Sequence, residues 1–203
     1  MHLATGQQRH ERCVHLAALV VADDRVVVAD DDQLMLIGLD GATVARTPRS
    51  HASAVDLGRV EGDAVLAAGD PVGGVTLHDR ATLAPVRSWR TGDGAILALR
   101  FRPDGGILAT GGERRVQLWD PATGLALAAS PDLPGPIAGL AWSPDGQTLA
   151  IAGAGGTVWV WSLPADDGRG LDDLVACVSP LRLKHAALTA AAFDPARCAA
   201  LTP

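Results

Sequence analysis

Two consecutive stretches of this chain repeat each other, and the repeat constrains the fold more than any other feature of the sequence. Phe101 precedes its counterpart Trp142 by 41 residues, and Trp119 precedes Trp161 by 42. Each stretch holds an apolar run closed by Pro-Asp-Gly, a second apolar run ending in Gly, and a third that contains Trp. Repeats with a period of about 40 residues are typical of chains whose units bury a core only by stacking on their neighbours.

Each repeat predicts four short strands separated by turns. In the first repeat the apolar runs are residues 96–101, 107–111, 116–119 and 125–129. Pro-Asp-Gly, Gly-Gly and Asp-Pro-Ala-Thr-Gly stand between these runs, and their backbone preferences reverse the chain. Four short antiparallel strands in about 40 residues are typical of one propeller blade. The sequence therefore predicts an all-β fold.

The sequence resembles the WD-repeat family of β-propellers, in a bacterial form. The motifs that carry the resemblance are FRPDG at 101–105 with LWD at 118–120, and WSPDG at 142–146 with VWS at 160–162. Weaker copies lie upstream, where His78 stands in the place of Trp, and around residues 26–38, which have no Trp. The opening of another unit follows at 184–195.

The resemblance implies an N-terminal segment, residues 1–12, and one propeller region, residues 13–203. The expected blades are residues 13–48, 51–91, 94–131 and 135–178, with a partial unit at 184–203. About four blades plus the first two strands of another favour an open arc, from a longer parent chain or a truncated product. The alternative is a five-blade ring in which residues 2–6 add a strand to the last blade.

The polar network of the family is incomplete here. In the family, a Gly-His pair before the first strand and an Asp in a later turn hydrogen-bond with a Ser or Thr and the Trp. His51 and His185 suit the first role in their own units, but the two best-matching units lack this His. Glu113 and Gly155 replace the turn Asp. We therefore expect these blades to depend on apolar packing.

The composition limits the classes of binding partner and the cellular compartment that we expect for this chain. The formal net charge is −6, with 48% hydrophobic and 20% charged residues. Nucleic acid and anionic membranes attract clustered Lys and Arg, so we expect neither as a partner. Widely spaced Cys13, Cys177 and Cys198 favour a reducing compartment, and the polar first residues contain no hydrophobic signal, which together predict a cytoplasmic protein. The strong preference for Arg over Lys indicates a GC-rich bacterial genome.

We predict no catalytic residue, no cofactor-binding residue and no metal ligand. His10, Cys13 and His15 are zinc-ligand types, but no second pair follows at a suitable spacing. The glycines at 153–156 precede an apolar run that predicts a strand, whereas glycine-rich phosphate loops precede a helix. A catalytic propeller would gather His, Asp or Glu on its inner strands, and those positions read Ile, Leu, Val and Ala.

Five residues are candidates for partner binding. Trp159 alternates with Trp161, so both indoles lie on one face of a strand. Trp is enriched at binding hot spots, although packing between blades also accounts for Trp159. The other candidates are Arg100, Arg102, Arg114 and Arg115, which form either a surface patch or scattered solvated side chains.

These observations predict a non-enzymatic scaffold that binds other proteins or the remainder of a parent chain. Open blade edges also predict self-association. Two alternatives belong to other classes of function: a sensor or regulatory segment of a larger bacterial signalling enzyme, and a ligand-binding or catalytic propeller that uses its central channel.

Overall fold

The computed structural model describes residues 16–22, 25–30, 32–48, 50–163, 181–184 and 187–190. The chain divides into two units, Met1–Leu163 and Pro164–Pro203. The regular elements of the described residues are all β-strands, which confirms the predicted all-β class. No helix in this part of the chain is long and apolar enough to cross a membrane.

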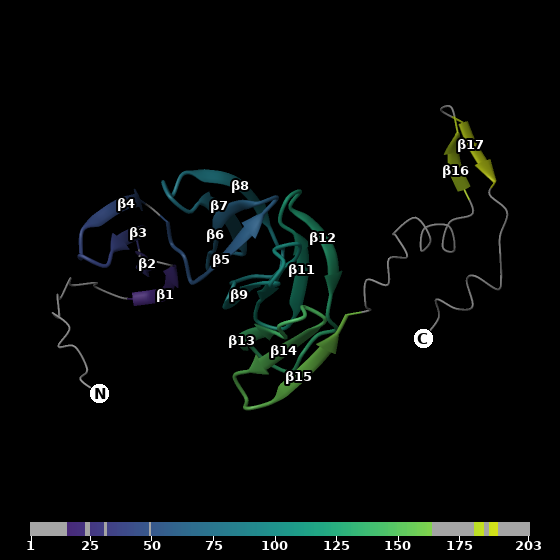
Figure 1. The fold of residues 1–203 in the computed structure, drawn as a ribbon. Helices are drawn as coiled ribbons and strands as arrows, with labels where there is room; N and C mark the ends of the chain where they lie inside the picture. Colours follow the sequence, from purple (N-terminus) through teal and green to yellow (C-terminus); the bar gives the residue numbers. More distant parts are fainter. Residues whose placement is uncertain are drawn as a thin grey trace. The chain divides into compact units, whose positions relative to one another are not determined.

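The first unit contains four antiparallel sheets, each a simple meander, which we call blades 1 to 4 (Figure 1). Blade 1 consists of β1 (Leu16–Ala22), β2 (Arg25–Asp30), β3 (Gln33–Gly38) and β4 (Thr43–Pro48). Blade 2 consists of β5 (Ala54–Val60), β6 (Asp63–Gly69), β7 (Gly74–Asp79) and β8 (Pro85–Arg90). Blade 3 consists of β9 (Ala98–Phe101), β10 (Leu108–Gly111), β11 (Val116–Asp120) and β12 (Leu125–Ala129). Blade 4 consists of β13 (Ile137–Trp142), β14 (Thr148–Gly153) and β15 (Val158–Ser162).

The second unit contains one described hairpin. Its strands, β16 (Leu181–Lys184) and β17 (Ala187–Ala190), pair in antiparallel register from Leu181 opposite Ala190 to Lys184 opposite Ala187. Residues 2–6, which would complete the last blade in the alternative five-blade ring, lie outside the described residues, as does the cluster of His10, Cys13 and His15. The predicted domain and blade boundaries stay predictions.

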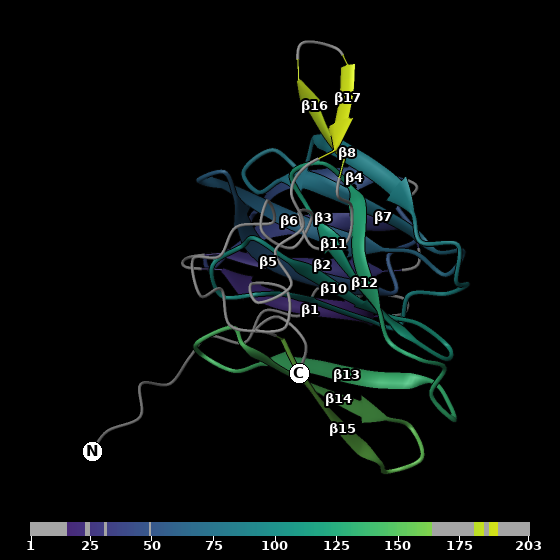
Figure 2. The same ribbon diagram turned by 90° about the vertical axis from the view of Figure 1, so that its right-hand side faces the viewer.

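The first strand of each blade is its inner strand. Strands β1, β5, β9 and β13 lie beside one another in sequence order, so the blades form an open arc (Figure 1). The fourth strands lie outermost: all five residues of β12 are exposed, and β12 runs along the side that faces the viewer in Figure 2. Strand β10, by contrast, is buried along its whole length because neighbouring blades cover both of its faces. This explains why most residues of the middle strands are apolar.

A separate apolar core fills each of the three spaces between consecutive blades. We call the face that a blade turns to the following blade its forward face, and the opposite face its rear face. Glycines on forward faces allow the close approach, because a Cβ at Gly58 would collide with the Phe101 ring, and one at Gly111 with the side chain of Ile137. Bulky rear-face side chains thus fit against small forward-face residues.

Candidate functional site

A cleft opens at one end of blade 3, where three loops meet. Residues 91–97 connect β8 to β9, residues 112–115 connect β10 to β11, and residues 130–136 connect β12 to β13. Because successive strands of a meander run in opposite directions, these three connections lie at the same end of the sheet. The cleft has a volume of about 410 Å³ and is lined by Leu97, Glu113, Arg114, Leu133, Pro134, Gly135 and Pro136. We call it the loop cleft.

The lining of the loop cleft combines apolar surface with opposite charges at its rim. Leu97 is 39% exposed, although its neighbours Ile96 and Ala98 are buried. Leu133 packs partly against the core between blades 3 and 4, which anchors the proline-rich loop. Glu113 and Arg114 are both exposed in the turn between β10 and β11. Apolar contact surface bordered by charge is the usual composition of a protein-binding site.

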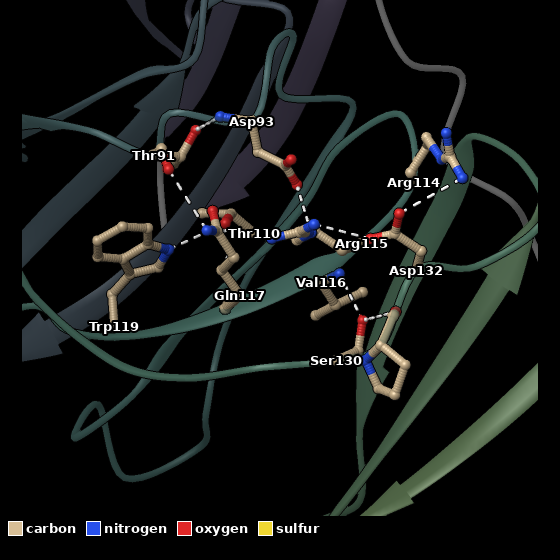
Figure 3. A network of polar contacts seen from close by, with 11 residues as sticks. Thr91, Asp93, Thr110, Arg114, Arg115, Val116, Gln117, Trp119, Ser130 and Asp132 are labelled. Atoms are coloured by element: carbon tan, nitrogen blue, oxygen red, sulfur yellow. Dashed lines mark hydrogen bonds and ion pairs between the residues drawn. The ribbon is translucent and has the colours of Figure 1, made fainter.

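An ion-pair network holds the rim in place, with Arg115 between two carboxylates (Figure 3). The Arg115 Nη2 atom lies 2.7 Å from Asp132 Oδ1, and its Nε lies 3.6 Å from Asp93 Oδ2. Hydrogen bonding to Asp132 and the charge of Asp93 raise the pKa of Arg115 above its ordinary value. Arg114 lies 3.4 Å from Asp132 and keeps 69% of its side chain exposed. The network thus leaves Arg114 as the cation most accessible to a partner.

Next to this network, Trp119 forms part of the polar arrangement that the resemblance to WD repeats implies (Figure 3). The indole Nε1 donates to Thr110 Oγ1 at 3.0 Å, and both residues are buried. Gln117 donates from Nε2 to the Thr91 carbonyl oxygen at 3.3 Å. Glu113, at the position of the family's Asp, lies exposed in its turn. The predicted incompleteness therefore applies to the acidic end of the network, while the Trp–Thr end is formed.

The inner strands carry a charged contact that the sequence interpretation missed, between buried Asp56 and half-exposed Arg100. Asp56 of β5 accepts hydrogen bonds from the Phe101 backbone N–H at 2.8 Å and from Arg100 Nη1 at 2.6 Å. The Arg100 carbonyl oxygen in turn accepts a bond from Trp142 Nε1 at 3.2 Å. The expectation of purely apolar inner positions is wrong here, and the pair links blades 2, 3 and 4. Burial outweighs the Arg100 charge and raises the pKa of Asp56.

We expect Asp56→Ala to lower the free energy of unfolding by about 2 kcal/mol, because the buried Phe101 N–H loses its acceptor. Urea denaturation of the unchanged protein and of Asp56→Ala measures this loss.

The ordinary pKa of Asp56 is 3.8, and the raised pKa in the folded state makes that state hold a proton that the unfolded state has lost. Between these values stability therefore falls as pH rises, and Asp56→Asn should remove that fall. An unchanged pH profile in Asp56→Asn would contradict the assignment.

The structure does not bring the four candidate arginines together. Arg114 lines the loop cleft and Arg115 forms an ion pair with Asp132 beside it, whereas Arg100 lies on the inner strand β9. Arg102 follows that strand at the opposite end of blade 3 and forms an ion pair with Asp104. Their roles in partner binding stay predictions.

Trp159 lies on the rear face of β15, half-buried against the core between blades 3 and 4. Trp161 lies on the same face, as the alternation predicted. A Cβ at Gly153 would collide with the Trp159 ring, so this indole covers the neighbouring strand of its own blade. Trp159 as a partner anchor stays a prediction.

Sequence interpretation missed Asp93, Asp132 and Leu133. A signal for Leu133 exists, because an isolated leucine stands between prolines in the segment PDLPGP at 131–136. A large apolar residue in a proline-rich loop is either anchored to the core or presented to a partner, and Leu133 lies where both apply.

Three four-stranded meander sheets and one of three described strands pack face to face along their inner strands, which defines the class of the protein, a β-propeller or an arc of one. Comparison with known families agrees: residues 84–120 and 129–162 each match the WD40 family, described as "WD domain, G-beta repeat". The chain therefore carries two matched WD repeats, which support a WD-repeat family. It is also 26% identical over 201 residues to the WD repeat-containing protein VIP3 of Arabidopsis thaliana. The match covers 89% of this chain and 62% of the length of that relative.

Solved structures share the fold. The computationally designed Ika4 protein matches with a TM-score of 0.66 at 19% identity, over 81% of this chain and 100% of that chain. U3-55K matches with a TM-score of 0.66 at 20% identity, over 78% of this chain and 52% of that chain. A chain in the structure of the Mitotic Checkpoint Complex matches with a TM-score of 0.61 at 19% identity, over 68% of this chain and 46% of that chain.

Proposed function

We propose that this chain is a non-enzymatic scaffold that binds other proteins, and that the loop cleft is one of its docking sites. The observation that carries the proposal is the cleft itself: an apolar lining that includes Leu97, beside the exposed cation Arg114. A segment of another protein that presents an apolar side chain fits this chemistry. The ion pairs of Arg115 preorganise the rim, which reduces the entropy lost on binding.

The likeness to a chain of the Mitotic Checkpoint Complex supports protein partners, since that chain is part of a complex. The net charge of −6 argues against nucleic acid and anionic lipid as partners. We also propose a bacterial source and a cytoplasmic location, and both rest on the amino-acid composition. The apolar faces at the two ends of the arc belong to it as association surfaces, for the rest of a parent chain or for a second copy. No observation favours the sensor-enzyme or catalytic-channel alternatives.

A double substitution at the loop cleft tests the proposal. We expect Arg114→Glu with Leu97→Ser to weaken the retention of partner proteins about tenfold or more, because it removes both the cation and the apolar contact. The full chain, immobilised, is incubated with extract of its source organism, and retained proteins are quantified by mass spectrometry.

The matched control is Arg59→Glu with Leu125→Ser. Both residues are exposed, and they adjoin connections at the opposite end of the blades from the loop cleft. The control should retain the same proteins as the unchanged chain. Equal retention by the cleft variant and the control would remove the loop cleft from the proposal.

A further inference from the structure

A pocket opens in the space between blades 1 and 2, at the same end of the blades as the loop cleft. Its volume is about 380 Å³, within the range of about 300–1,000 Å³ that is usual for ligand sites. Exposed lining residues come from the connections before β5 and after β6, and they include His51, Pro71 and Val72. Buried lining residues include Ala68 of β6 and His78 of β7. The pocket therefore leads from an exposed mouth with apolar surface to a buried wall.

The buried wall is the rear face of blade 2, where three side chains are smaller than their counterparts in blade 3. Gly69 and Gly111 each make the strand pair next to the turn between the second and third strands, which aligns the two blades. At the aligned positions His78 replaces Trp119, Thr76 replaces Gln117 and Ala68 replaces Thr110, and the three blade 3 residues are labelled in Figure 3. The large indole of Trp119 fills the space between blades 2 and 3, whereas the smaller residues leave a pocket between blades 1 and 2.

The facing wall, which blade 1 contributes, is reduced in the same way. Thr47 of β4 has the register position that Trp89 has in β8. The ring centres of Trp89 and Trp119 lie 6.0 Å apart, so two indoles occupy the space between blades 2 and 3. Between blades 1 and 2 the same two positions hold Thr47 and His78, and the buried side chain of Leu83 fills only part of the difference.

His78 supplies the pocket with a hydrogen-bond acceptor. Its Nδ1 atom lies 2.9 Å from the Leu83 carbonyl oxygen, which also accepts a bond from Thr47 Oγ1 at 3.1 Å. Because a carbonyl oxygen only accepts, Nδ1 carries the proton, and Nε2 of the neutral ring is then an acceptor. Burial lowers the pKa of His78 and so favours the neutral ring at pH 7. In the described part of the chain no residue hydrogen-bonds to Nε2, so this acceptor remains available to a ligand.

We propose that this pocket binds the tryptophan side chain of a partner protein. An indole fills the equivalent space between blades 2 and 3, and an indole N–H is the donor that His78 Nε2 lacks. Val72 at the mouth is 65% exposed and offers apolar contact to the residues beside that tryptophan. Buried tryptophans are common anchors of protein interfaces. The inference goes beyond the proposed function, because it adds a second docking site that does not depend on the loop cleft.

Isothermal titration of the full chain with N-acetyltryptophanamide, which presents the side chain on a peptide backbone, tests the proposal. Saturable binding with a Kd of about 1 mM or tighter is expected for a ligand of this size. His78→Trp and Thr76→Gln each place the blade 3 side chain in the pocket, and each should weaken binding at least about tenfold. Thr157→Gln, in an exposed turn of blade 4, is the matched control and should bind normally. Far-UV circular dichroism should be the same for all four proteins.

Two further probes distinguish the source of the ligand and the role of the hydrogen bond. N-acetylphenylalaninamide lacks the N–H donor and should bind at least about fivefold more weakly. Binding of free indole without binding of N-acetyltryptophanamide would assign the pocket to a small molecule and overturn the proposal. Binding that is unchanged in both His78→Trp and Thr76→Gln, or no binding to the unchanged protein, would overturn it too. The loop-cleft variant should bind the probe normally, which separates this outcome from failure of the cleft to retain partners.

Discussion

Trp119→Ala is expected to lower the free energy of unfolding by about 3–5 kcal/mol, the usual range for deleting a buried tryptophan. Trp119 is 5% exposed and lies in the core between blades 2 and 3. Its ring centre is 6.0 Å from that of Trp89, at an interplanar angle of 43°. Removal of the indole leaves a cavity between two blades that cannot close without moving both. Urea denaturation followed by far-UV circular dichroism measures the change.

Trp119→Phe separates packing from hydrogen bonding at this position. The phenyl ring refills most of the space but leaves the buried Thr110 hydroxyl without its indole donor. A loss of about 1–2 kcal/mol is expected, well below that of the alanine variant. Equal losses for the two variants would mean that the hydrogen bond, rather than the packing of the ring, provides the stabilisation.

The strands of blades 3 and 4 could be predicted because their signals are local. Pro-Asp-Gly closes the first apolar run in both repeats, and the run at 107–111, which Gly111-Gly112 closes, becomes β10 at Leu108–Gly111. The run at 96–101 was predicted two residues too long, since β9 begins at Ala98. Ile96 is nevertheless buried, because it packs over Gly69 of the preceding blade before the strand starts. At the start of this run, apolar character therefore indicates burial of the side chain and does not indicate pairing of the backbone in a strand.

The polar contacts could not be predicted because they join positions far apart in the chain. Asp56 and Arg100 are 44 residues apart, so neither residue's surroundings in the sequence indicate the other. Their pairing depends on the register of β5 beside β9, which only the packing of two blades sets. The same holds for the loop cleft, whose lining comes from three connections that meet in space.

The position of Trp159 could be predicted only in part. Alternation along the strand correctly placed it on the same face as Trp161. Which face of blade 4 would be covered was not set by the strand itself, since Val158 and Val160 are also apolar. The described structure packs the tryptophan face against blade 3 and leaves Val158 and Val160 64% and 67% exposed, while Trp159 as a partner anchor stays a prediction.

Gly105→Ala is expected to lower the free energy of unfolding by about 3 kcal/mol or more, for two reasons that add. Gly105 has a φ of 79°, which penalises any residue with a Cβ by about 1–2 kcal/mol. A Cβ would also collide with the backbone carbonyl oxygen of Arg59 in blade 2. Overpacking of this kind adds about 1–3 kcal/mol, and backbone gives way less readily than a side chain. The variant therefore pushes two blades apart at the turn between β9 and β10.

Gly62→Ala is the matched control, because Gly62 lies in the corresponding turn of blade 2 with a φ of 94° and nothing within 4 Å of an added Cβ. Only the backbone penalty of about 1–2 kcal/mol applies there. Urea denaturation of both variants isolates the contribution of the close approach between blades. If Gly105→Ala destabilised the protein no more than Gly62→Ala, blades 2 and 3 would have to be further apart at this turn than the structure places them.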